Sequence, residues 1–351
     1  MPKIAIIGTG SWGITLAMAL AGNELQVSLW ARTEQEAVQL ANVGPNPNLT
    51  NGLSFPAMLS ITSSLEEALA GAKAVILVVP SRSMRQNMKL VAGYLSQSML
   101  VVSASKGLEI SSGKRMSQVI AEEIQPDFRS NICVLSGPNL SQEILTDLPA
   151  ATVVAAKDEA VARKAQKLLT TPNFCIFTNT DVIGVELGSA MKNIIALGAG
   201  ITDGLGYGNN AKAALITRGL TEIMALGVAL GANPLTFSGL AGLGDLIATC
   251  ASPLSRNHYV GVELANGRPL KEITDSMTGV AEGVSTTLVV WNLAQQMGLE
   301  MPITETLYRV LYEGADLHQA TIELMRAGAA HELAGRKWKL FSNLKSHEDS
   351  N

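Results

Sequence analysis

The feature that most constrains this chain is a glycine pattern near its start. Residues 4–7 form an apolar run typical of a buried strand, and Gly8, Gly10 and Gly13 follow in the spacing G-x-G-x-x-G. A helical stretch, 14–21, comes directly afterwards. In this setting the first glycine allows a tight turn, the second lets a phosphate approach the backbone, and the third lets the helix pack against the strand. The pattern therefore predicts a dinucleotide site, with the pyrophosphate at the N-terminus of the helix.

Strand-like and helical segments alternate through the first half of the chain. The run at 74–79 is apolar throughout, as expected for a strand covered on both faces. This alternation predicts a doubly wound, Rossmann-type α/β sheet. The expected strands are 4–7, 26–30, 60–62, 74–79, 100–103, 132–135, 151–155 and 174–177, the expected helices are 14–21, 65–70, 83–95 and 158–169, and 44–56 is expected to be a loop.

The pattern changes after Asp181, because no strand-like run of β-branched residues appears again. Such a change marks a domain boundary. We expect a dinucleotide-binding domain over 1–180, an all-helical substrate domain over 181–335 and a loose tail over 336–351. The expected helices of the second domain are 181–199, 210–231, 235–249, 258–265, 283–297 and 304–313.

Composition argues against several functional classes. The 351 residues suffice for two domains, and the net charge of −4 gives no basic surface for nucleic acid. The three isolated cysteines form no C-x-x-C motif, so we expect no metal site and a reducing, cytoplasmic location. Because the first strand begins at once, no signal peptide is expected. The most apolar stretch, 182–201, contains Glu186, Lys192 and Asn193, which favours a core helix over a membrane span.

The end of the second expected strand indicates which nucleotide is bound. In this fold an acidic residue there usually binds the ribose 2′-hydroxyl of NAD. Arg32 occupies that place, 19 positions after Gly13. A guanidinium suits a 2′-phosphate instead, so we predict that NADP(H) is accepted as well as NAD(H). The alternative is a solvated arginine in a loop. Nearby Glu34 and Glu36 are interpreted as residues of the first turn of a helix.

A lysine in the most apolar helix is the candidate catalytic group. Lys192 lies in a stretch that is apolar nearly all round, and a buried lysine without a partner or a task is costly. Its neighbours Gly188, Ser189 and Ala196 are small, which would leave space for a ligand. Its ammonium would protonate the alkoxide during ketone reduction, and its neutral amine would accept the proton during alcohol oxidation. The alternative is a structural pair with an acid such as Asp245.

The protonation state of Lys192 indicates which direction of the reaction should be easier. With an ordinary pKa of about 10.4, deprotonation near pH 7.5 would cost roughly 4 kcal/mol. Burial and a second cation, Lys106, would both lower this pKa. We therefore expect reduction to be the easier direction at neutral pH. Lys106 follows the strand at 100–103 and should point into the cofactor crevice, the alternative being a surface lysine beside a turn.

Three further segments offer polar groups to the same crevice. Gly137 and Pro138 form a rigid turn at the end of a strand. The sequence Ser-Arg-Asn at 255–257 supplies hydroxyl, guanidinium and amide donors, which suit a phosphate. Asp245, after a glycine turn, is suited to bind a substrate hydroxyl or to orient the catalytic lysine, and Glu282 is a second glycine-flanked acid. The alternative for both acids is a helix N-cap.

Taken together, these segments resemble the NAD(P)-dependent glycerol-3-phosphate dehydrogenases of the bacterial type. The resemblance covers almost the whole chain. It implies reduction of dihydroxyacetone phosphate to sn-glycerol 3-phosphate, a phospholipid precursor, by a homodimer whose subunits join a Rossmann domain to an all-helical domain. The matching stretches are GTGSWG at 8–13, SKG at 105–107, SGP at 136–138, ELGSAMKN at 186–193, GLGDL at 242–246, SRN at 255–257 and VAEG at 280–283.

The resemblance also implies roles for individual residues, with Lys192 as the general acid/base. Many members carry Ser or Thr where this chain has Asn139, whose amide can still donate to the substrate. The substrate would contact Lys106, Gly137, Asn139, Lys192, Asp245, Ser255, Arg256 and Asn257, with Arg256 and Asn257 on its phosphate. Together with the motif glycines Gly8, Gly10 and Gly13, the cofactor would contact Ser11, Trp12, Arg32, Lys106, Ser141, Arg256, Val280 and Glu282.

Two other functions stay open at this stage. A related β-hydroxyacid dehydrogenase combines the same two domains with a catalytic lysine, but its substrate carries a carboxylate where residues 255–257 favour a phosphate. A nucleotide-sensing regulator without catalysis would have no need of Lys192 or Asp245. Oxidation of NADPH in the presence of dihydroxyacetone phosphate separates the enzyme from the sensor.

Overall fold

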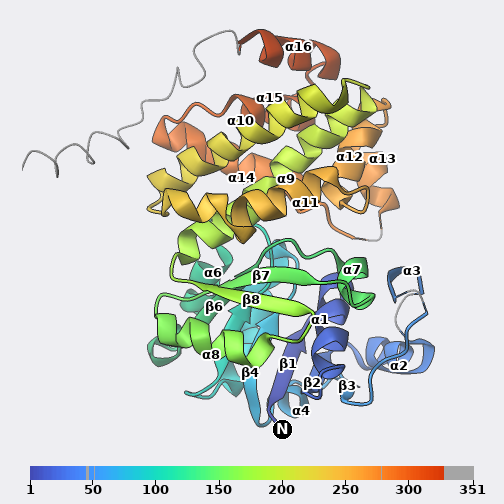
Figure 1. Cartoon of the computed structure of the whole chain (residues 1–351), viewed down its shortest axis with the longest axis vertical. Helices are drawn as coiled ribbons and strands as arrows, with labels where there is room; N and C mark the ends of the chain where they lie inside the picture. The colour runs from blue at the N-terminus through green and yellow to red at the C-terminus, as the bar shows by residue number, and fades with distance from the viewer. Residues whose placement is uncertain (45–46, 51, 278, 328–351) are drawn as a thin grey trace, which may run out of the picture.

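A sheet domain and a helical domain lie one above the other (Figure 1). The structure, a computed structural model, describes residues 1–44, 47–50, 52–277 and 279–327. The expected tail over 336–351 lies outside these residues, as does part of the expected loop 44–56, whose described part includes the short helix α3 (Pro47–Thr50). Within the described residues, the last strand ends at Asn179 and only helices and turns follow. The predicted fold class is confirmed.

The described strands form one sheet of eight in the order β3-β2-β1-β4-β5-β6-β7-β8. All neighbouring strands are parallel except β6 and β7. The strands are β1 (Lys3–Ile7), β2 (Gln26–Trp30), β3 (Leu59–Thr62), β4 (Ala72–Leu77), β5 (Leu100–Ser103), β6 (Ile132–Ser136), β7 (Ala150–Ala155) and β8 (Phe174–Asn179).

The antiparallel pair is a feature that the strand pattern did not reveal. After β6 the chain stays at the carboxyl edge of the sheet, where α7 (Ser141–Leu145) packs against α1 (Ser11–Ala21). It therefore enters β7 from that edge and runs back along β6. The helix α8 (Glu159–Leu169) then crosses over, so that β8 is parallel to β7.

The apolar runs of the central strands are explained by cover on both faces. In β1, Ile4 and Ile6 pack into one hydrophobic cluster, and Ala5 and Ile7 pack into another on the opposite face. The first cluster is completed by α1 and α8, and the second by helices on the other side. Those helices are α4 (Leu65–Leu69), α5 (Met84–Val91) and α6 (Met116–Glu123), whereas α2 (Glu34–Val43) lies beside β3.

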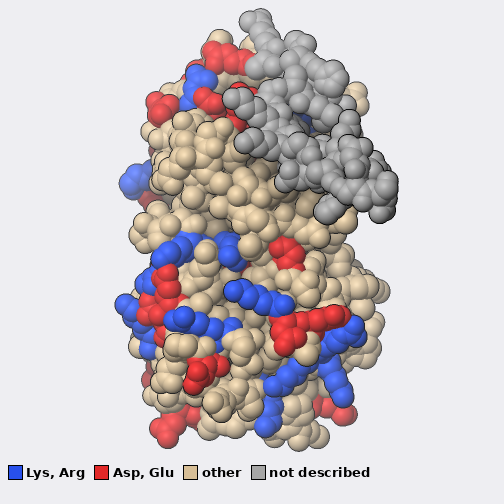
Figure 2. Space-filling model, turned by 90° about the vertical axis from the view of Figure 1, so that its left-hand side faces the viewer, with Lys and Arg blue, Asp and Glu red and all other residues tan. Residues whose placement is uncertain are grey.

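The helical domain is built around α9 (Val182–Gly204), which α10, α11, α12 and α14 surround (Figure 1). By length and composition α9 is able to cross a membrane, but 94% of its apolar stretch is buried inside the protein, which agrees with a core helix. On the face shown in Figure 2, basic and acidic side chains are interspersed over the sheet domain. The other helices are α10 (Gly208–Ala229), α11 (Asp245–Ala251), α12 (Arg256–Ala265), α13 (Leu270–Ser276), α14 (Glu282–Met297), α15 (Pro302–Tyr312) and α16 (Leu317–Ala327).

The single helix expected over 235–249 is wrong, because the chain bends there. A 3₁₀ turn (Pro234–Ser238) and a π turn (Leu240–Gly244) precede α11. A Cβ at Gly242 would lie 2.1 Å from the Phe237 carbonyl oxygen, so only glycine permits this bend. A Cβ at Gly188 would lie 2.6 Å from the Ala241 carbonyl oxygen. The space beside Gly188 is therefore filled by this turn and not by a ligand, and the turn places Asp245 against α9.

Candidate active site

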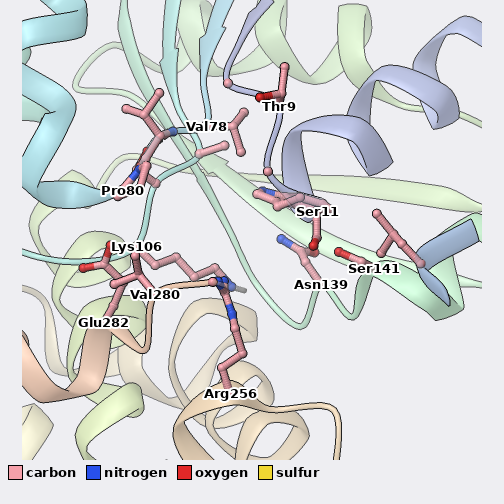
Figure 3. A pocket seen from close by; sticks show the side chains of 18 of the residues that line it. Thr9, Ser11, Val78, Pro80, Lys106, Asn139, Ser141, Arg256, Val280 and Glu282 are labelled. Atoms are coloured by element: carbon pink, nitrogen blue, oxygen red, sulfur yellow. The ribbon is translucent and has the colours of Figure 1, made fainter. Parts of the chain in front are cut away.

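A pocket of about 730 Å³ opens between the two domains. The loops at the carboxyl ends of the strands form one wall, and the other is formed by the middle of α9, by α11 and by the first residues of α12 and α14. Figure 3 shows Ser11, Asn139 and Ser141 on the sheet-domain side, with Arg256 reaching toward them from the helical domain. This is the switch-point crevice in which α/β sheets bind their ligands.

The glycine turn has the geometry that a pyrophosphate needs. Gly8 has φ +121°, and a Cβ there would lie 2.4 Å from the Val78 carbonyl oxygen. A Cβ at Gly13 would lie 2.0 Å from the Gly8 carbonyl oxygen, whereas nothing lies within 4 Å of one at Gly10. The outer glycines are therefore required by close packing, and the middle one leaves its backbone open. No side chain caps α1, so the N–H groups of its first turn are available to phosphate.

Two buried polar atoms in the pocket wall lack a partner among the described residues. They are the indole nitrogen of Trp12 and the side-chain oxygen Oδ1 of Asn139. The amide nitrogen of Asn139 donates to Thr152 at 3.3 Å, so its oxygen is the atom left over. A buried polar atom without a hydrogen bond costs free energy. A dinucleotide bound in this pocket offers donors and acceptors along its length, so the wall fits the cofactor that the glycine turn predicts.

The far end of the pocket is lined by residues after β2. Trp30, Arg32, Thr33 and Glu36 all contribute. The side chain of Arg32 is exposed and makes no hydrogen bond or ion pair with the described residues. It lies where the adenosine ribose is held in this fold. A free guanidinium there remains available for a 2′-phosphate.

Lys192 lies at the centre of a buried polar network. The residue is 5% exposed and is one of those that line the pocket. The amine donates to Asp245 Oδ1 and to the Thr249 hydroxyl, the latter at 2.5 Å. The other carboxylate oxygen of Asp245 accepts from Lys106 at 2.7 Å. Lys106 also donates to the Gly137 carbonyl oxygen at 2.9 Å. One carboxylate thus holds two amines, one from each domain.

The pKa of Lys192 is lowered to about 7, mainly by burial; Asp245 opposes this shift, and the nearby Lys106 adds to it. Both causes expected from the sequence therefore act on this lysine. The cost of deprotonation near neutral pH becomes small compared with the roughly 4 kcal/mol for an unperturbed amine. Protonation of Lys192 alone then gives little preference for reduction over oxidation near pH 7.

Asp245 lies beneath the pocket and does not line it. It is 1% exposed and is the first residue of α11, where its carboxylate is bonded to the two lysines. This position matches the interpretation that Asp245 orients Lys192, and the contact with a substrate hydroxyl stays a prediction. Its side chain does not cap α11. Gly137 and Gly13 are likewise close to the pocket without lining it.

The Ser-Arg-Asn segment lies where α12 begins. Ser255 caps the helix by accepting from the His258 N–H at 3.2 Å. The Asn257 amide bridges two helices, donating to Asn193 at 3.0 Å and accepting from the Gly283 N–H at 2.9 Å. The side chain of Arg256 is open to the pocket and has no hydrogen-bond partner among the described residues, yet the surrounding protein lowers the pKa of its guanidinium. All of its guanidinium donors are therefore available, whereas the Asn257 amide already donates to Asn193.

Glu282 joins the two domains at the edge of the pocket. Its carboxylate accepts from the backbone N–H and the hydroxyl of Ser81, at 3.0 and 2.6 Å. The N-cap of α14 is Ala281, so the alternative N-cap interpretation of Glu282 is wrong. Figure 3 places Glu282 and Val280 close to Lys106. The predicted site residues that line the pocket are Gly8, Gly10, Ser11, Trp12, Arg32, Lys106, Asn139, Ser141, Lys192, Ser255, Arg256, Asn257, Val280 and Glu282.

Sequence reasoning missed several polar residues of the pocket wall, among them Thr9, Glu36, Asn193 and Thr249. Thr249 lies one helical turn after Asp245, a spacing that was available as a signal. Asn193 directly follows the catalytic candidate. Thr9 lies inside the glycine motif, and its hydroxyl donates to Glu36, which had been interpreted only as a first-turn helix residue. That contact joins the glycine-rich loop to the first turn of α2 and leaves no local pattern in the sequence.

Comparison with known proteins assigns the family. The family profile described as NAD-dependent glycerol-3-phosphate dehydrogenase N-terminus matches residues 3–162, and that of the C-terminus matches residues 181–322. The chain belongs to the NAD-dependent glycerol-3-phosphate dehydrogenase family. It is therefore an NAD(P)-dependent oxidoreductase of the glycerol 3-phosphate and dihydroxyacetone phosphate pair.

Relatives match over nearly the full length. A glycerol-3-phosphate dehydrogenase [NAD(P)+] of Dehalococcoides mccartyi is 65% identical over 342 residues, which are 97% of this chain and 95% of the relative. One of Geobacter metallireducens is 48% identical over 323 residues, covering 92% and 96%. The crystal structure of the Coxiella burnetii glycerol-3-phosphate dehydrogenase matches with a TM-score of 0.87 at 35% identity, covering 92% of this chain and 98% of that one.

Proposed function

We propose that this enzyme reduces dihydroxyacetone phosphate to sn-glycerol 3-phosphate with Lys192 as the proton donor and Arg256 as the phosphate anchor. The observation that carries this proposal is a buried amine and an unpaired guanidinium in the wall of one pocket, next to the glycine turn. The amine suits a carbonyl oxygen, and the guanidinium suits a phosphate. The presence of both cations in the wall of one pocket therefore favours a small phosphorylated ketone.

Each residue of the network has a distinct task in this proposal. The nicotinamide, when bound, supplies the hydride that reduces the carbonyl carbon. The Lys192 ammonium polarises the carbonyl oxygen and gives it a proton as negative charge develops there, which leaves a neutral amine. Asp245 and Thr249 hold that amine in position. Lys106, bonded to the same carboxylate, keeps the Lys192 pKa low, so that its proton leaves readily and is regained from solvent.

We further propose domains at 1–180 and 181–335, a homodimer, a cytoplasmic location and a role in phospholipid synthesis. The helix-only pattern after Asn179 supports the domain division. The dimer and the metabolic role rest on the family resemblance. Three free cysteines support a reducing compartment, and burial raises the thiol pKa of Cys133 and Cys250 to about 12. Sedimentation equilibrium tests the dimer.

The proposed reaction is tested by following NADPH and NADH absorbance with dihydroxyacetone phosphate as the substrate. We expect oxidation of both cofactors, dependent on the ketone. A 2-keto acid without phosphate should give less than about one hundredth of the kcat/KM, because Arg256 would lack its partner. A greater kcat/KM with the keto acid would favour the β-hydroxyacid dehydrogenase. Cofactor binding without turnover on either substrate would favour the nucleotide sensor.

A further inference from the structure

A carboxylate lies beside the free guanidinium at the end of β2. Glu36, in the first turn of α2, lines the pocket together with Thr9 and Arg32. One oxygen of its carboxylate accepts from the Thr9 hydroxyl, and the other accepts from the Arg32 backbone N–H at 3.0 Å. The carboxylate is thus held between the glycine-rich loop and the end of β2. These two segments flank the adenosine ribose in a dinucleotide-binding fold.

The anion is fixed, whereas the neighbouring cation is free. Glu36 is half-buried and forms no ion pair within the described ranges, even though Arg32 is four residues away. The Arg32 side chain is exposed and has no partner in the same part of the chain. Glu34, on the same turn of helix, points elsewhere, because it accepts from the Ser63 hydroxyl and does not line the pocket. Only one of these two acids therefore lines the pocket.

A fixed carboxylate and a free guanidinium favour different nucleotides. Each carboxylate oxygen has a second lone pair and can accept a further hydrogen bond, such as one from a ribose hydroxyl. A hydroxyl at the ribose 2′ position is a donor, whereas a 2′-phosphate is an anion that the carboxylate repels. The guanidinium of Arg32 attracts that phosphate. Because the carboxylate is already held in place, little ordering entropy is lost when it binds a hydroxyl.

We propose that Glu36 sets the cofactor selectivity of this dehydrogenase, by binding the ribose hydroxyls of NAD(H) and repelling the 2′-phosphate of NADP(H). The inference rests on the assignment of this pocket to the cofactor. Arg32 and Glu36 then act in opposition, one for each nucleotide. An attractive group for one ligand and a repulsive group against the other is the usual basis of discrimination between two close analogues.

The test is the equilibrium binding of NAD⁺ and NADP⁺ to the full-length protein by isothermal titration calorimetry, without substrate. Glu36→Gln keeps the size of the side chain and one acceptor, but removes the charge. We expect the Kd for NADP⁺ to fall about tenfold and the Kd for NAD⁺ to rise about threefold. The Kd ratio should therefore shift about 30-fold toward NADP⁺. The Kd for adenosine 2′,5′-bisphosphate should fall and the Kd for ADP should rise, as for NADP⁺ and NAD⁺. This result would restrict the effect to the adenosine end of the cofactor.

Two variants serve as controls. Glu34→Gln removes the same charge from the same helical turn outside the pocket, and its Kd ratio should stay within about twofold of the wild type. Arg32→Ala should move the ratio the other way, toward NAD⁺. Equal changes in both Kd values, or none, for Glu36→Gln would show that Glu36 only braces the two loops, and the proposal would be overturned. Wild-type protein that binds neither nucleotide would overturn the cofactor site itself, and this role with it.

Discussion

Replacing Lys192 by methionine should lower the turnover number for dihydroxyacetone phosphate by about 10³- to 10⁴-fold. Methionine has a similar length, but it can neither polarise a carbonyl oxygen nor donate a proton. The Kd for NADPH should stay within about threefold, because the glycine turn and the residues after β2 are untouched. Steady-state kinetics with saturating cofactor, together with calorimetric binding of NADPH, measure both effects.

The variant should fold, because Asp245 keeps its ion pair with Lys106 and burial already disfavours the charge of Lys192. Lys212→Met is the matched control. Lys212 forms an ion pair at 2.7 Å with Asp203 of the neighbouring helix and does not line the pocket. The turnover number of the Lys212→Met enzyme should therefore be unchanged. If the Lys192→Met enzyme kept more than about a tenth of the wild-type turnover number, Lys192 would not be the proton donor.

Replacing Arg256 by alanine should raise the KM for dihydroxyacetone phosphate by about 30- to 1000-fold. The estimate corresponds to about 2–4 kcal/mol, the loss of one or two charge-assisted hydrogen bonds to a phosphate in a partly desolvated pocket. Lysine at this position should recover part of the loss, because it keeps the charge and loses the fork of donors. Initial rates over a wide range of ketone concentration measure the change.

Unphosphorylated dihydroxyacetone separates a phosphate anchor from general damage to the site. Wild type and Arg256→Ala should use this poor substrate with kcat/KM values within about threefold, because neither can form the missing phosphate contact. Arg268→Ala, which removes an arginine paired with Glu263 away from the pocket, should leave the KM unchanged. An equal loss on both ketones would show that Arg256 shapes the pocket without binding phosphate.

Much of the site could be predicted because its signals are local. A strand followed at once by three spaced glycines has few other uses, and the steric contacts of Gly8 and Gly13 are those that the motif implies. Lys192 stood out as a charge within an apolar helix. Arg32 was found by counting from the last glycine to the end of the next strand.

The missed features depend on contacts between distant segments. Lys106 and Asp245 are 139 positions apart and belong to different domains, so no pattern pairs them. The bend before α11 depends on backbone contacts at Gly242 and Gly188, which helix periodicity does not register. The reversed direction of β7 depends on where α7 packs. In each case the sequence shows the residue type, but it does not show which distant residue that side chain or backbone contacts.

The central claim is that a buried lysine with a lowered pKa transfers the proton, and the pH dependence of kcat/KM in both directions tests it most directly. Reduction needs the ammonium, so its kcat/KM should fall as the pH rises through about 7. Oxidation needs the free amine, so its kcat/KM should rise over the same range. Titration of a substrate phosphate near pH 6 acts in the same sense in both directions, so a break near pH 7 with opposite sense in the two profiles identifies the lysine. An oxidation profile that is flat from about pH 6 to 10 would contradict the account.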